Sequence, residues 1–98
     1  MQRIVFLDRK SLKAEVRRPN FPHQWEEHPQ TLAPEVASRL VGATVAITNK
    51  VPIRRAALEQ LPDLKMIAVA ATGYDVIDID ACRERGIAVA NKIGRAHV

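Results

Sequence analysis

Short apolar runs recur along this chain and predict its β-strands. Four of them, at residues 4–7, 44–48, 65–70 and 87–90, consist mainly of Ile, Val, Leu and Ala. A more polar segment at residues 25–28, which Pro29 stops, predicts one further strand. The later runs are apolar at consecutive positions rather than at alternate ones. This pattern is typical of a parallel sheet that is covered on both faces.

Segments with helical spacing separate the later strands. They predict helices at residues 34–40, 53–61 and 79–85. The first has Glu35 in its opening turn and ends at Gly42, and the last has Asp78 as its N-cap and Gly86 as its C-terminal stop. Strands and helices that alternate in this way predict an α/β fold, doubly wound and flavodoxin-like.

In such a sheet, ligands bind beyond the carboxyl ends of the strands, so the loops at residues 8–10, 49–52 and 71–75 are candidate binding loops. Lys50 can act as a point charge for an anionic substrate, although most exposed lysines are only solvated. Free N–H groups around Thr72 and Gly73 can hold a carboxylate, whereas the simpler interpretation is a strand-to-helix turn. For Asp8 we expect a cap or turn after the first strand.

Composition narrows the class of protein. A chain of 98 residues fits one small domain. The net charge of +4 comes from basic residues that are spread among acidic ones, and the short pair Arg17-Arg18 has no interleaved aromatic residue, so we expect no nucleic-acid partner. The single cysteine, Cys82, points to a reducing compartment. The first apolar run is too short for a signal peptide or a membrane span, which predicts a cytoplasmic protein without a membrane partner.

Several kinds of site are not predicted. The sequence contains no G-x-G-x-x-G, and therefore no dinucleotide fingerprint. His23 and His28 are five residues apart, which does not suit a metal pair on one helix face, and we expect no metal site. Cys82 is predicted to be a small core residue within its helix.

The sequence resembles the D-isomer-specific 2-hydroxyacid dehydrogenases, most of all their glycerate dehydrogenase and hydroxypyruvate reductase branch. The resemblance runs from about residue 4 to residue 91 and is strongest over residues 64–91. The matching features are, in order, an apolar strand, the turn Thr72-Gly73-Tyr74-Asp75, Asp78, a short helix, Arg85-Gly86-Ile87, a strand and Asn91. The segment from Thr48 to Pro52 is also similar to that branch.

The resemblance implies that residues 1–91 are the amino-terminal part of the substrate domain, which is then incomplete. It implies hydride transfer between NAD or NADP and a small D-2-hydroxy or 2-oxo acid, in a full-length parent that is a homodimer. Lys50, Thr72 and Gly73 match positions at the substrate cleft. The family's catalytic Arg, Glu and His lie downstream together with the cofactor site, so none maps onto this chain. We therefore expect this chain alone to be inactive and to bind no cofactor.

A stand-alone α/β binding or regulatory module is the alternative. A receiver-like domain needs an acidic pair after the first strand and an Asp after the third. This chain has only Asp8 at the first place and Thr48-Asn49-Lys50 at the second, which counts against the alternative.

Residues 92–98 depart from the family pattern. A widely used short-read sequencing adapter contains ATC-GGA-AGA-GCA-CAC-GTC-TGA, which translates as Ile-Gly-Arg-Ala-His-Val and a stop, the sequence of residues 93–98. We therefore expect this tail to be non-native, and Arg95 and His97 are not candidates for the family's catalytic Arg and His.

Overall fold

A computed structural model describes residues 2–11, 20, 22–70 and 76–91. Five strands and three α-helices make up about half of this part of the chain. Two short 3-10 turns, η1 (Arg9–Ser11) and η2 (Ala33–Glu35), accompany them. The strands are β1 (Gln2–Phe6), β2 (His23–Glu27), β3 (Val45–Thr48), β4 (Met66–Val69) and β5 (Ala88–Asn91), and the helices are α1 (Val36–Leu40), α2 (Arg55–Leu58) and α3 (Ile79–Glu84).

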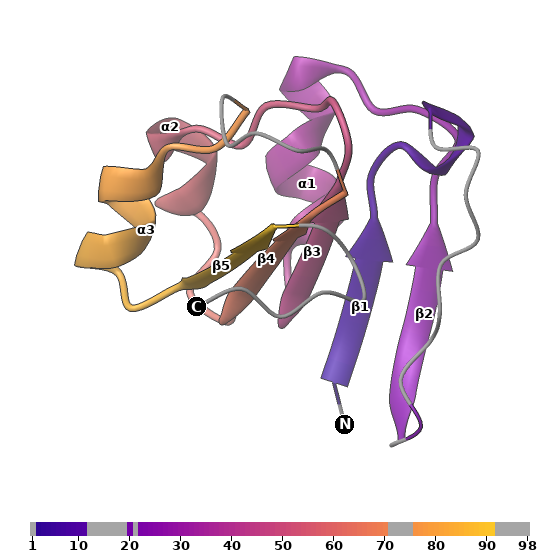
Figure 1. The fold of residues 1–98 in the computed structure, drawn as a ribbon, viewed down its shortest axis with the longest axis horizontal. Coiled ribbons are helices and arrows are strands. Elements are labelled where there is room, and N and C mark those ends of the chain that lie inside the picture. Colours follow the sequence, from indigo (N-terminus) through magenta and orange to yellow (C-terminus); the bar gives the residue numbers. More distant parts are fainter. Residues whose placement is uncertain (1, 12–19, 21, 71–75, 92–98) are drawn as a thin grey trace.

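The strands form one parallel sheet in the order β2-β1-β3-β4-β5 (Figure 1). This is the flavodoxin-like order, and the predicted α/β class is confirmed. The predicted strand at residues 25–28 corresponds to β2, which pairs with β1 at one edge of the sheet. Because every pair is parallel, the carboxyl ends of all the strands lie along one edge.

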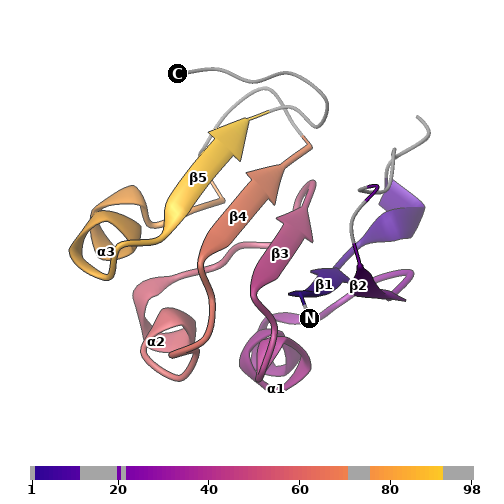
Figure 2. The same cartoon turned by 90° about the horizontal axis from the view of Figure 1, so that it is seen from below.

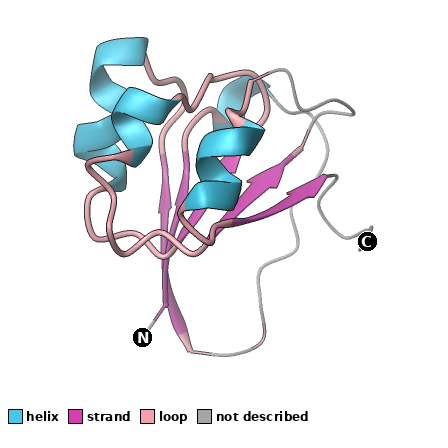
Figure 3. Ribbon diagram, turned by 90° about the vertical axis from the view of Figure 1, so that its left-hand side faces the viewer, coloured by secondary structure: helices cyan, strands magenta, loops and turns pink. Residues whose placement is uncertain are grey.

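All three described α-helices lie on the same face of the sheet (Figure 2), and a view from the side shows the same layering (Figure 3). The main core lies between this face and the helices. It includes Val5, Ala46 and Ile67 from the sheet and Leu40 and Leu58 from the helices, all of them fully buried. Burying a side chain of this size contributes about 1.5–3 kcal/mol, so this layer provides most of the stabilisation.

The opposite face of the sheet carries a smaller apolar cluster of Ile4, Phe6 and Ile47. Trp25 packs against this cluster from the edge strand. None of the α-helices in the described part of the chain covers this face. The expectation that both faces are covered therefore stays a prediction.

Caps and turns confirm most of the predicted helix ends. The Asp78 carboxylate accepts a hydrogen bond from the N–H of Ala81 at 3.0 Å, which makes it the N-cap of α3. Gly42 and Gly86 have φ angles of 81° and 69°, a left-handed conformation that favours glycine, and they follow α1 and α3. Cys82 lies in the main core as predicted, and burial raises the pKa of its thiol.

The helix predicted at residues 53–61 is shorter than expected. Only Arg55–Leu58 is α-helical, and Ile53 instead forms an isolated parallel bridge with Ile77. Burying the Ile53 side chain in the core stabilises the bridged conformation more than helix formation would stabilise this residue. The predicted apolar face does hold, because Leu58 and Leu61 are buried and Ala57 packs against the core.

No helix within the described ranges is long and apolar enough to cross a membrane. The predicted tail at residues 92–98 lies outside the described residues, as do Arg17 and Arg18.

Candidate functional site

The carboxyl ends of β1 and β3 lie side by side and bring two of the predicted binding loops together. The N–H of Leu7 donates to the carbonyl of Ile47 at 2.9 Å, which continues the β1–β3 pairing beyond the strand ends. Asp8 follows on one side, and Asn49 and Lys50 follow on the other. Residues more than 40 positions apart in sequence therefore share one corner of the sheet.

Asp8 joins the two loops through its carboxylate. Oδ1 accepts a hydrogen bond from the N–H of Asn49 at 2.9 Å, and Oδ2 accepts one from the N–H of Lys50 at 2.7 Å. Oδ2 also accepts from the hydroxyl of Ser11 at 2.9 Å. The residue is only 4% exposed, and a buried carboxylate is stabilised by hydrogen bonds of this kind.

Ser11 and Asn49 close the same network from the other side. The side-chain N–H₂ of Asn49 donates to the carbonyl oxygen of Ser11 at 3.2 Å and to its hydroxyl oxygen at 3.0 Å. The N–H of Ser11 donates to the carbonyl of Asp8 at 3.0 Å, which forms the turn that the sequence predicted there. The sequence did not predict the contacts of Asp8 with Asn49 and Lys50, and its one signal was an acidic residue directly after a buried strand.

Thr48 fixes the start of the second loop. Its hydroxyl donates to the carbonyl of Val51 at 2.9 Å. The same hydroxyl oxygen accepts a hydrogen bond from the N–H of Val51 at 3.0 Å. Thr48 is fully buried. Two hydrogen bonds between Thr48 and Val51 therefore close this turn, and Lys50 is its exposed residue.

Lys50 has its N–H on Asp8, while its side chain is exposed. Its ammonium group is thus available at the edge where ligands bind in folds of this class. The other two predicted binding residues, Thr72 and Gly73, lie outside the described residues. Ala70 and Val76 flank that segment, and each is hydrogen-bonded to a residue that flanks the Lys50 loop. The N–H of Ala70 donates to the carbonyl of Thr48, and the N–H of Ile53 donates to the carbonyl of Val76.

A cavity of about 290 Å³ lies beside this corner, at the ends of β1 and β2. It is lined by Arg9, Lys10, Glu27 and Pro29. Arg9 lies 3.8 Å from the Glu27 carboxylate and stacks 5.9 Å from the centre of the Phe6 ring. The corner is therefore mixed in charge, because the loop after β1 carries Arg9 and Lys10 and the edge strand carries Glu27.

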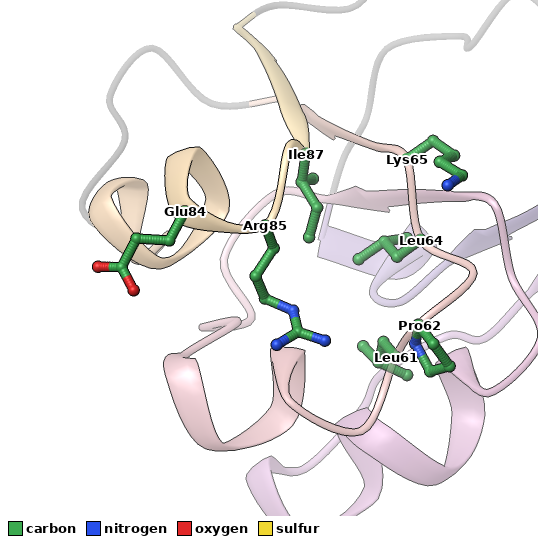
Figure 4. Close-up of a pocket in the computed structure, with 7 residues that line it drawn as sticks. All are labelled: Leu61, Pro62, Leu64, Lys65, Glu84, Arg85 and Ile87. Atoms are coloured by element: carbon green, nitrogen blue, oxygen red, sulfur yellow. The ribbon is translucent and has the colours of Figure 1, made fainter.

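A second cavity, of about 230 Å³, lies at the opposite edge, where β4 and β5 begin. Its lining includes Leu61, Leu64, Arg85 and Ile87. Figure 4 shows the Arg85 side chain extending toward the loop that holds Leu61, while the Glu84 carboxylate points away. Because this edge holds the amino ends of the strands, the cavity is not part of the Asp8 and Lys50 corner.

The sequence lacks the glycine spacing of the usual dinucleotide-binding site. Such a site requires glycines at the first, third and sixth positions of a strand-to-helix turn. The glycines of this sequence are at positions 42, 73, 86 and 94, so none are two apart. What the described part of this corner offers a ligand is the exposed ammonium group of Lys50.

Comparison with known proteins identifies the family of this chain. Residues 4–96 match the D-isomer specific 2-hydroxyacid dehydrogenase family, catalytic domain. The glycerate dehydrogenase of Methylorubrum extorquens is 55% identical over 91 residues, which are 92% of this chain and 29% of that protein. The hydroxypyruvate reductase of Blautia hydrogenotrophica is 44% identical over 57 residues, 58% of this chain and 18% of that protein.

Solved structures share the fold at lower sequence identity. The NAD⁺-bound 3-phosphoglycerate dehydrogenase of Entamoeba histolytica superposes with a TM-score of 0.72 at 22% identity, covering 92% of this chain and 32% of that one. The D-lactate dehydrogenase of Escherichia coli superposes with a TM-score of 0.68 at 21% identity, covering 93% of this chain and 30% of that one.

This chain spans less than a third of the length of these relatives. The match nevertheless covers nearly all of its own residues, in the order and fold of the family. The chain belongs to the D-isomer-specific 2-hydroxyacid dehydrogenase family and corresponds to part of its catalytic domain.

Proposed function

We propose that this chain forms one side of the substrate cleft of an oxidoreductase that transfers hydride between NAD or NADP and a small D-2-hydroxy acid. Glycerate and hydroxypyruvate represent the proposed class of substrate. The observation that carries the proposal is the 55% identity to a glycerate dehydrogenase over 92% of the chain.

Lys50 is the proposed anion-binding side chain. It is exposed at the carboxyl edge of the sheet, its backbone is fixed by Asp8, and its loop is bonded to both flanks of the segment that contains Thr72 and Gly73. An ammonium group here attracts the carboxylate of a 2-oxo acid without requiring a bidentate geometry. By family resemblance, Thr72 and Gly73 provide backbone donors to the same carboxylate.

The remaining machinery is proposed to lie outside this chain. The nicotinamide supplies the hydride acceptor or donor when it is bound. No residue of this chain is assigned to that cofactor or to acid–base catalysis, and we expect no turnover from the chain alone. We further propose that the complete enzyme is a cytoplasmic homodimer.

A hybrid enzyme tests the proposal. Residues 1–91 of this chain replace the matching segment of the M. extorquens glycerate dehydrogenase, and NADH oxidation is followed with hydroxypyruvate. We expect a hybrid that reduces hydroxypyruvate. A hybrid that folds and binds NADH but reduces neither hydroxypyruvate nor glyoxylate would contradict the proposed function.

The role of Lys50 is tested in the same hybrid. Lys50→Met keeps the length of the side chain and removes its charge, so we expect KM for hydroxypyruvate to rise about tenfold, which corresponds to ~1.4 kcal/mol. Lys65→Met is the matched control, because Lys65 is exposed at the opposite edge of the sheet. Equal values of KM in the two variants would contradict the assignment of Lys50.

A further inference from the structure

We propose that Asp8 is a positioning residue for substrate binding, acting through the backbone of Lys50. This inference rests on the proposed function, and it assigns the buried acid at the corner a task beyond closing a turn. Asp8 itself does not contact the substrate in this proposal.

The geometry that supports it is a carboxylate shared between two loops. Asp8 belongs to the loop after β1, yet both of its side-chain oxygens accept N–H donors from the loop after β3. At 2.9 and 2.7 Å these are short hydrogen bonds to a charged acceptor, a class that is stronger than neutral hydrogen bonds. The third donor, the hydroxyl of Ser11, is local to the first loop and holds the carboxylate itself.

This arrangement determines what the Lys50 loop offers a ligand. The N–H groups of Asn49 and Lys50 both point to Asp8, so they are not donors to an external anion. The Asn49 side chain is also bonded, to Ser11. Among the hydrogen-bond donors of these two residues, only the Lys50 ammonium group is therefore left for an anion. The backbone that carries it is fixed by the bonds from the N–H groups of Asn49 and Lys50 to Asp8.

Fixing that backbone reduces the entropy that substrate binding must remove. A loop that is free to move has to be ordered when it binds an anion, and this loss of conformational freedom weakens binding. Anchoring the loop beforehand leaves only the Lys50 side chain to be ordered. Loss of the anchor should therefore weaken substrate binding much more than it slows the chemical step.

Asp8→Asn in the active hybrid enzyme is the experiment. Asparagine has nearly the same shape, but its N–H₂ group cannot accept the hydrogen bond from Lys50 or Asn49 that it faces. We expect KM for hydroxypyruvate to rise three- to tenfold, with kcat changed by less than twofold. Asp63→Asn, which neutralises an exposed acid in the turn before β4, is the matched control and should change neither constant.

Combining Asp8→Asn with Lys50→Met separates positioning from a purely structural role. If Asp8 acts through Lys50, the double variant should have the KM of Lys50→Met alone, because the anchored side chain no longer binds the anion. A loss of general fold stability would instead lower the thermal midpoint and the amount of active enzyme, and therefore the apparent kcat. Independent contributions of the two residues to substrate binding would multiply in KM. Multiplied effects, or an unchanged KM in Asp8→Asn, would overturn the inference.

Ser11→Ala keeps the experiment decisive if Asp8→Asn does not fold. It removes the hydroxyl that donates to Asp8 and accepts from the Asn49 side chain, and it leaves the Asp8 carboxylate in place. We therefore expect a smaller rise in KM that also disappears in the Lys50→Met background. A rise that persists in that background would count against the inference. A folded, NADH-binding hybrid without any reductase activity would contradict the proposed function, and this inference with it. An active hybrid in which only Lys50→Met raises KM would contradict the inference alone.

Discussion

Ile53 and Ile77 form a one-residue parallel bridge that joins the segments following β3 and β4. The N–H of Ile53 donates to the carbonyl of Val76 at 2.7 Å, and the N–H of Asp78 donates to the carbonyl of Ile53 at 3.2 Å. Both isoleucines are buried. The bridge ties the segment after Lys50 to the segment after Thr72 and Gly73, so that two proposed parts of the substrate cleft are linked through the backbone.

Truncation of Ile53 should therefore be costly. Ile53 is fully buried, and Ile53→Ala should lower the free energy of unfolding by about 2–5 kcal/mol, whereas Ile53→Val should lower it by roughly 1 kcal/mol. Urea unfolding followed by the fluorescence of Trp25, the single tryptophan, measures both losses. Leu32→Ala is the control because Leu32 is 63% exposed, and an equal loss there would refute the assignment of Ile53 to the core.

The N-cap of α3 makes a separate contribution to stability. Asp78→Ala removes the acceptor for the N–H of Ala81 and should reduce the free energy of unfolding by about 1 kcal/mol. Asp78→Asn keeps an oxygen acceptor at the same place, so its loss should be smaller. Thermal unfolding of the two variants side by side checks the order, and a larger loss for Asp78→Asn would show that charge rather than capping is important here.

Acid should weaken a contact on the edge strand. Glu26 accepts a hydrogen bond from Arg3 at 2.9 Å and lies 2.6 Å from His28 Nε2, and these two partners, Arg3 foremost, lower the pKa of Glu26 below its usual 4.5. A lowered pKa in the folded state means that the ionised form stabilises the fold. That contribution is present above pH 4.5 and is lost as pH falls through the lowered value.

Glu26→Gln makes this loss measurable. The difference in the free energy of unfolding between the original chain and this variant should be largest at pH 5 and should shrink steadily toward pH 3. Because the Glu26 side chain is 40% exposed, we expect a small difference throughout. A difference that stays constant from pH 5 to pH 3 would contradict the prediction.

Replacing Gly86 should destabilise the fold because of its backbone conformation and not because of a steric clash. Its φ of 69° is left-handed, yet a Cβ atom there would have nothing within 4 Å. Gly86→Ala should therefore destabilise the chain by about 1 kcal/mol through backbone strain, and Gly86→Asn should be less harmful because asparagine tolerates this conformation better. Chemical denaturation of both variants tests this, and an alanine variant as stable as the original chain would refute it.

The proposed origin of the tail is tested by DNA sequencing. We expect the codons for residues 93–98 to be ATC-GGA-AGA-GCA-CAC-GTC followed by TGA. The family match runs as far as residue 96 and so does not separate the tail from the family sequence. Any other set of codons at these positions would contradict an adapter origin.

The class of fold and most of its elements could be predicted from the order of residues alone. Consecutive apolar positions in short runs specify buried parallel strands, and caps such as Asp78 and Gly86 act within a few residues of their own helices. Such local signals can be read directly from the order of residues. The family pattern over residues 64–91 also depends only on that order.

Contacts between residues that are far apart in the sequence depend on how the strands pair and pack. The pattern around Ile53 predicted a helix, but its burial against Ile77 placed it in a bridge instead. Asp8 and Lys50 are 42 positions apart, and no local pattern indicates that one accepts a hydrogen bond from the other. Parallel pairing of β1 with β3 brings their carboxyl ends together, and this pairing makes a turn-forming acid the anchor of the proposed substrate-binding loop.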